Sequence, residues 1–78
     1  MDKPTGAQPI VIDGVTFRCF HTGVLRYEWR ADGPTKIKVR QNHNHKTYSA
    51  WVDTFCVGSR FRSVEAAMRG AMKTAAAR

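Results

Sequence analysis

Cysteine and histidine are the residue types of this chain best suited to chemistry, because their sulfur and nitrogen atoms bind metals and can act as nucleophiles. They stand at Cys19, His21, His43, His45 and Cys56. The Cys-x2–4-Cys and His-x3–5-His spacings typical of structural zinc sites are absent. We therefore expect no metal site, and we expect both cysteines to be thiols packed as small apolar side chains.

The sequence contains no pattern typical of an enzyme. It has no glycine-rich phosphate loop, no nucleophile elbow and no paired-carboxylate motif. Asp13 and Asp32 each precede a glycine, which indicates a role in turns. Asp53 lies near Cys56, but no histidine is spaced to form a recognisable Cys–His pair. We predict a protein that is not an enzyme and uses no cofactor.

Positive charge is the strongest indication of function. The chain has 13 Lys and Arg against 6 Asp and Glu, which gives a net charge of +7 and favours acidic partners through long-range attraction. We predict a partner-binding surface formed by six basic residues and one aromatic residue: Arg18, Arg26, Arg30, Lys36, Lys38, Arg40 and Trp51. Two alternatives stay open: the charges serve only solubility, and Trp51 belongs to the core.

The length of 78 residues corresponds to one small domain. Residues 1–9 are polar and are interpreted as a flexible N-terminal tail, and residues 10–78 as a single basic α+β domain. The tail lacks the apolar stretch of a signal peptide, and no apolar run approaches the length of a membrane span. We expect a cytoplasmic protein without membrane contact, and so small a core also favours homodimerisation.

Alternating apolar and polar residues predict several antiparallel strands separated by turn residues. The predicted turns are Asp13-Gly14, His21–Gly23, Ala31–Thr35 and Asn42–His45. The predicted strands cover residues 10–12, 15–20, 24–30, 36–41 and 47–57, the last as one strand or a strand pair.

The last segment predicts a helix from Val64 to about Ala77. Ser63 is a suitable N-cap, and Glu65 fits the first turn, where the helix dipole favours a negative charge. The apolar stripe consists mainly of small side chains, which allow close approach to a sheet: Val64, Ala67, Met68, Ala71 and Ala75. Gly70 is consistent with such an approach.

Together these elements predict an α+β fold, an antiparallel β-meander of 3–5 strands with one C-terminal α-helix packed on one face. We expect the helix to cover Phe17, Tyr27, Trp29, Ile37 and Val39. The opposite face would present the basic residues, with Phe20 and, if it is not core, Trp51 between them. Cations that hold phosphates and rings that stack on bases would suit this face to nucleic acid.

Residues 57–67, VGSRFRSVEAA, resemble the strand–turn–helix end of AP2-like and integrase-arm DNA-binding domains. Those families show a similar Gly-x-Phe-x-Ser/Thr-x-Glu-Ala-Ala pattern after a three-stranded sheet. The resemblance covers only this segment, and one additional residue separates Gly58 from Phe61 here. It implies a DNA-binding function.

The chain as a whole is similar to short anti-CRISPR proteins of phages and mobile elements, in particular those that act on type I (Cascade-type) systems. The similarity lies in its size, its basic charge, the absence of catalytic motifs and the Ala-, Met- and Arg-rich helix. It implies an inhibitor that covers a surface of the effector complex and prevents target DNA binding, in the host cell cytoplasm if the protein is phage-encoded. A charge of +7 excludes an acidic DNA mimic.

We therefore predict an anti-CRISPR inhibitor whose basic surface engages an acidic protein surface of a nucleoprotein complex. One alternative is a small DNA- or RNA-binding module of phage origin that acts through the basic sheet face. A structural or accessory phage protein is the third interpretation.

Overall fold

Seven strands and a C-terminal helix make up the described part of the chain, residues 3–4, 8–21, 26–33, 36–44 and 46–77 of a computed structural model. The elements are β1 (Lys3–Pro4), β2 (Ile10–Ile12), β3 (Val15–His21), β4 (Tyr27–Ala31), β5 (Ile37–Gln41), β6 (Tyr48–Val52), β7 (Phe55–Phe61) and α1 (Val64–Ala77). No helix in these residues has the length and apolarity needed to cross a membrane.

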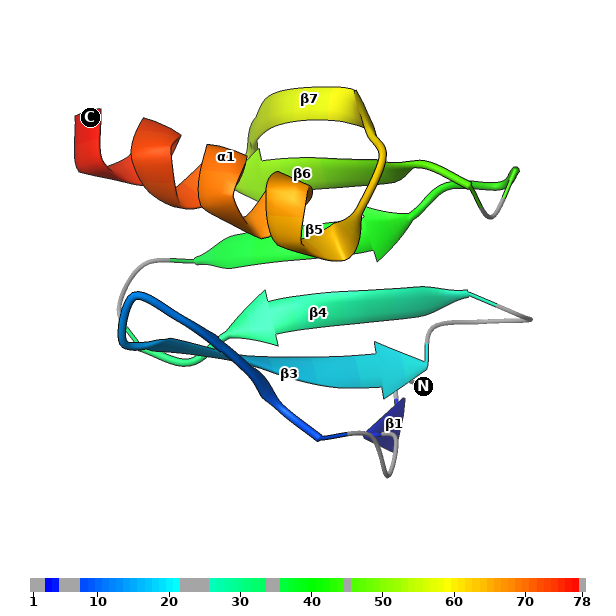
Figure 1. The fold of residues 1–78 in the computed structure, drawn as a ribbon, viewed down its shortest axis with the longest axis horizontal. Coiled ribbons are helices and arrows are strands. Elements are labelled where there is room, and N and C mark those ends of the chain that lie inside the picture. The colour runs from blue at the N-terminus through cyan, green and yellow to red at the C-terminus, as the bar shows by residue number, and fades with distance from the viewer. Residues whose placement is uncertain (1–2, 5–7, 22–25, 34–35, 45, 78) are drawn as a thin grey trace.

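All the strand pairings are antiparallel, in the order β1-β3-β4-β5-β6-β7, with β2 also paired to β3. Strands β3 to β7 therefore form a meander, with α1 on one side of it (Figure 1). The predicted α+β class, antiparallel sheet and C-terminal helix are confirmed. The predicted number of 3–5 strands was too low, because β1 precedes the first predicted strand and residues 47–57 form parts of two strands, β6 and β7.

Two tight turns depend on aspartates in the left-handed backbone region. Asp13 (φ 48°) and Gly14 (φ 81°) join β2 to β3, as the Asp-Gly sequence predicts. Asp53 (φ 54°) begins the two-residue turn between β6 and β7, whose flanking residues Val52 and Phe55 are paired. This second turn lacks a glycine, so the sequence left open whether the segment forms one strand or two.

The pairing register sorts the side chains onto two faces of the sheet. Phe17, Val39 and Ala50 lie on the face that carries α1 and have no solvent exposure. We call this the helix face. The residues between them in sequence point to the opposite side, as period-two alternation requires.

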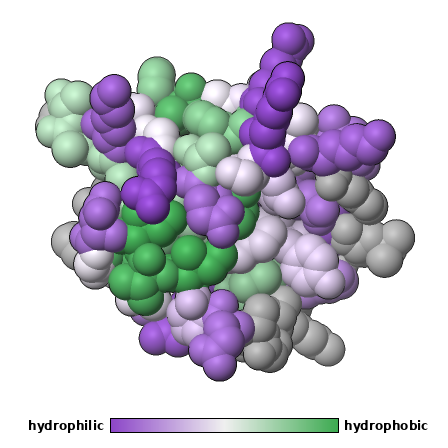
Figure 2. All heavy atoms as spheres, viewed as in Figure 1, coloured by the Kyte–Doolittle hydropathy of each residue, from purple (hydrophilic) through white to green (hydrophobic). Residues whose placement is uncertain are grey.

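Helix α1 packs on β5, β6 and β7, and it also contacts β2. Its small inner residues Ala67 and Ala71, together with Met68, are completely buried. In the orientation of Figure 1, Figure 2 shows a contiguous apolar region below the helix, bordered by hydrophilic side chains. The helix thus covers only part of its face of the sheet.

This partial coverage corrects one prediction. Phe17, Ile37 and Val39 are buried as expected, but Trp29 is only half-buried and Tyr27 is 42% exposed. Among the described elements, the backbone of α1 lies close to β2, β5, β6 and β7 but not to β4, and Tyr27 at the start of β4 is left exposed. The prediction that the helix covers Tyr27 was therefore wrong.

The ring of Phe61, the last residue of β7, lies between two glycines. A Cβ atom built on Gly58 would lie 3.0 Å from Cε2 of this ring, and one built on Gly70 would lie 3.0 Å from Cε1 and Cζ. A Cβ atom at either position would therefore be closer to the ring than ordinary van der Waals contact allows, and the ring would have to shift by a few tenths of an ångström. This close approach explains why a glycine occupies the interior of α1.

We predict that Gly70→Ala destabilises the protein, although alanine is normally favoured over glycine in a helix interior by about 1 kcal/mol. Gly58 packs against the ring from the other side, so Phe61 cannot retreat from the new methyl group. Overpacking of this kind should lower the free energy of unfolding, measured by urea denaturation, by about 1–2 kcal/mol. In a Phe61→Leu background the same change should become stabilising. An equal loss in both backgrounds would contradict the collision with the ring.

Candidate functional site

The face of the sheet opposite α1 carries two neighbouring rows of side chains across β3, β4, β5 and β6. Neighbours within each row are cross-strand partners, which lie about 5 Å apart. We call this surface the open face. One row is Phe20, Glu28, Arg40 and Ser49, and the other is Arg18, Arg30, Lys38 and Trp51.

Glu28 lies within the open face and is only 1% exposed. Its Oε2 accepts a hydrogen bond from Nε of Arg30, and its Oε1 accepts bonds from Nε and Nη2 of Arg40 at 3.0 and 2.8 Å. The two arginine side chains remain 37% and 35% exposed. A buried carboxylate therefore fixes two guanidinium groups at the surface. The sequence showed only an acid among basic residues and did not reveal this bridging role.

Aromatic rings lie beside cations at two places on the open face. The guanidinium carbon of Arg30 lies 4.4 Å from the ring centre of Phe20. Around Trp51, Nζ of Lys38 and the guanidinium carbon of Arg40 lie 5.1 and 5.8 Å from the ring centre. Such distances allow cation–π attraction, which keeps the long basic side chains near the rings.

Trp51 is half-buried, and its register places it on the open face beside Lys38. Its neighbours in sequence, Ala50 and Val52, are buried in the core on the helix face. Of the two interpretations left open by the sequence, the structure therefore places Trp51 outside the helix-side core.

The other residues of the predicted surface lie nearer its margins. Arg18 on β3 is exposed and donates from Nε to Asp32 at 2.8 Å. Arg26 precedes β4, with Nη1 3.3 Å from Nε2 of His43. Lys36 is exposed immediately before β5. The structure thus brings Arg18, Arg30, Lys38, Arg40 and Trp51 together, while Arg26 and Lys36 lie outside the strands.

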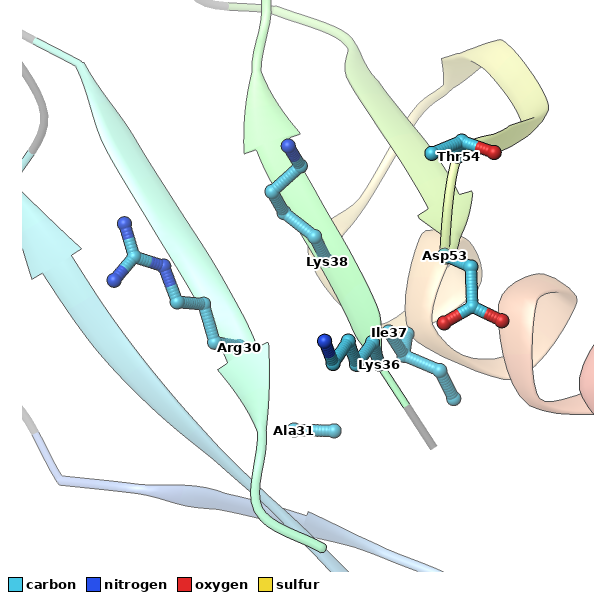
Figure 3. A pocket seen from close by; sticks show the side chains of 7 residues that line it. All are labelled: Arg30, Ala31, Lys36, Ile37, Lys38, Asp53 and Thr54. Atoms are coloured by element: carbon cyan, nitrogen blue, oxygen red, sulfur yellow. The ribbon is translucent and has the colours of Figure 1, made fainter. Parts of the chain in front are cut away.

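A shallow pocket of about 460 Å³ lies at the end of the open face where β4 ends and β5 begins. Arg30 borders it on one side and the β6–β7 turn on the other, with the first residues of β5 between them (Figure 3). The lining residues are Arg30, Ala31, Lys36, Ile37, Lys38, Asp53 and Thr54. The positive charge of the open face therefore continues into a concave site.

The described residues contain no group of three or more His, Cys, Asp or Glu side chains that could hold a metal ion. Cys19 is buried and Cys56 is exposed. The prediction that both thiols are packed was wrong for Cys56, which lies on β7 at the edge of the sheet. His45 lies outside the described residues.

Comparison with known proteins adds no further information about the site. No known protein family, curated protein or solved structure matches this chain. Its function is therefore inferred from the side chains and their geometry.

We predict that Glu28→Gln lowers the free energy of unfolding by about 2–4 kcal/mol, because it leaves two guanidinium groups without their buried carboxylate. Asp32→Asn is the matched control, since it removes an exposed partner from Arg18 and should cost less than about 1 kcal/mol. Thermal and urea denaturation of both variants measures the difference. Equal losses of unfolding free energy in the two variants would show that the buried ion pairs of Glu28 contribute no more stability than the exposed ion pair between Asp32 and Arg18.

Proposed function

We propose that this chain is a non-enzymatic module that binds nucleic acid on its open face. The observation that supports this most strongly is that Arg18, Arg30, Lys38 and Arg40 share one face with the rings of Phe20 and Trp51. Lysine and arginine bind phosphates of any sequence, and aromatic rings stack on bases. The helix packs on the other face and so leaves this surface accessible.

The spacing of the cations suits an extended polyanion. Arg18, Arg30 and Lys38 lie in one row on three neighbouring strands. Strands in a sheet are about 4.8 Å apart, so the row spans roughly 10 Å before the side chains extend. Contacts over this distance favour a ligand with several phosphates over a single small anion.

The buried carboxylate of Glu28 supports the same function. It engages Nε and Nη2 of Arg40, so the orientation of this guanidinium group is fixed before a ligand arrives. Such preorganisation reduces the side-chain entropy lost on binding. Glu28 therefore lowers the net charge of the open face, but it makes the remaining hydrogen-bond donors better defined.

A second candidate function uses the same surface. In this proposal the chain is an anti-CRISPR inhibitor whose open face covers an acidic surface of a CRISPR effector complex and prevents target DNA binding. Trp51 favours it, because this half-buried tryptophan lies beside Lys38 and Arg40, and tryptophan and arginine often dominate protein–protein binding energies. Under either proposal the chain would act in the cytoplasm, and a homodimer would present a larger binding surface.

The first test measures binding of a labelled single strand and a labelled duplex by fluorescence anisotropy at several salt concentrations. Lys38→Gln should weaken binding and lower the slope of log affinity against log salt by about 0.7–0.9, the value expected for one phosphate contact. Arg69→Gln is the control, because this exposed arginine lies on α1 and should change neither.

If naked nucleic acid binds only weakly and Lys38→Gln has no effect on it, the nucleic-acid proposal fails. Pull-down of a purified type I effector complex then tests the inhibitor proposal, with Lys38→Gln and Arg69→Gln as the compared variants. Retention of the complex by both variants alike would exclude the open face as the contact surface.

We predict that Trp51→Ala weakens binding of single-stranded nucleic acid by about 1–3 kcal/mol, because a stacking surface is lost. Tyr27→Ala is the matched control, since Tyr27 is 42% exposed but lies on the helix face. Circular dichroism verifies that both variants are folded. Equal effects of the two substitutions would show that the open face has no special role in stacking.

A further inference from the structure

We propose that the pocket at the end of the open face binds a phosphorylated nucleotide. This inference rests on the proposed nucleic-acid function and assigns to Lys36 and Asp53 roles that the flat part of the face does not need. The ligand would be the phosphorylated end of a strand or a free nucleoside monophosphate, which share the same chemistry.

The charged side chains that line the pocket are mostly basic. Lys36 and Lys38 are opposed there by a single carboxylate, that of Asp53, and Arg30, which also borders the pocket, is paired with Glu28. Within the described part of the chain, no ion pair involves Lys36 or Lys38. The pocket therefore carries a positive charge that an anionic group would neutralise, and phosphate is well suited to lysine and arginine donors.

The size and polarity of the pocket also suit a nucleotide. A volume of about 460 Å³ is within the range of roughly 300–1,000 Å³ typical of small-molecule sites and exceeds what a phosphate ion alone would fill. Ala31 and Ile37 also line the pocket, so part of its wall is apolar. A nucleotide offers a matching combination, because it joins a flat, partly apolar base and a sugar to a phosphate.

The charged and polar lining residues lie on different sides of the pocket. In Figure 3, Arg30 lies on one side of the pocket, Asp53 and Thr54 lie on the other, and Lys36 and Lys38 lie between them. A carboxylate accepts hydrogen bonds and repels phosphate, so Asp53 favours a ligand with donors at the end away from its phosphate. The hydroxyl and amino groups of nucleotides are such donors.

The pocket is also held in shape by the backbone. The N–H of Asp53 donates to the carbonyl of Lys36 at 2.8 Å, which joins the β6–β7 turn to the start of β5. Asp53 itself has a left-handed backbone, φ 54°, which fixes the direction of the turn. The two sides of the pocket are therefore linked before any ligand binds, which lowers the cost of binding.

The test uses the full chain and follows backbone amides by two-dimensional NMR during titration with adenosine 5′-monophosphate. We expect saturable shifts at Ala31, Lys36, Asp53 and Thr54, and at least about tenfold weaker binding of adenosine and of inorganic phosphate. Lys36→Gln should weaken binding of the nucleotide about tenfold, and Arg69→Gln should not. Absence of saturable shifts, or equal affinity of the Lys36→Gln variant and the parent, would overturn the proposal.

A second arm separates the two sources of the ligand. A short single strand with a 5′-phosphate is compared with the same strand ending in a hydroxyl group. Tighter binding of the phosphorylated strand, abolished by Lys36→Gln, identifies a strand end as the ligand. Equal binding of both strands together with saturable binding of adenosine 5′-monophosphate identifies a free nucleotide.

The two proposals can fail separately. If Lys36→Gln removes nucleotide binding but leaves binding of hydroxyl-ended strands intact, the pocket and the open face act independently and both proposals stand. If strands do not bind while the mononucleotide does, the open-face proposal fails and the pocket remains. If strands bind but the mononucleotide gives no saturable shifts, only the pocket proposal fails.

Discussion

The buried carboxylate of Glu28 is the interaction on which the open face most depends. A carboxylate with 1% exposure is costly unless charged hydrogen-bond donors compensate it, and Arg30 and Arg40 do so from β4 and β5. A slip of one residue between these strands would turn Arg40 to the helix face and leave the carboxylate with only Arg30. The ion pairs therefore fix the strand register and the positions of the surface cations at the same time.

The two faces of the sheet differ, because one packs against α1 and the other is the surface to which we assign binding. Small residues of α1 approach β5, β6 and β7 closely, and the ring of Phe61 fills the space that Gly58 and Gly70 leave. Because this compact packing needs only one face, aromatic rings on the other face are not required for the core. Trp51 is the clearest example, since Ala50 and Val52 on either side of it are buried while its own ring lies beside two cations.

Features that depend on local sequence could be predicted, and features that depend on tertiary arrangement could not. Asp13-Gly14 indicated its turn because both residues tolerate a left-handed backbone, and alternation placed Arg18 and Lys38 on one face. Alternation assigns a side chain to a face but does not say how far a helix extends over it, which is why the exposure of Tyr27 was missed. The burial of Glu28 depends on residues from two strands, so no local pattern indicates it.

The charge of the open face is smaller than the composition of the chain suggests. Asp32 pairs with Arg18, and Glu28 pairs with both Arg30 and Arg40, so four cations including Lys38 are opposed by two carboxylates. At physiological salt, charges more than about 8 Å apart are largely screened, so this local balance matters more at close range than the total of +7. In the proposed function, affinity for nucleic acid would therefore come largely from Trp51, Phe20 and oriented donors. Lys36 and Lys38, without an ion pair among the described residues, are the side chains best placed to neutralise phosphate.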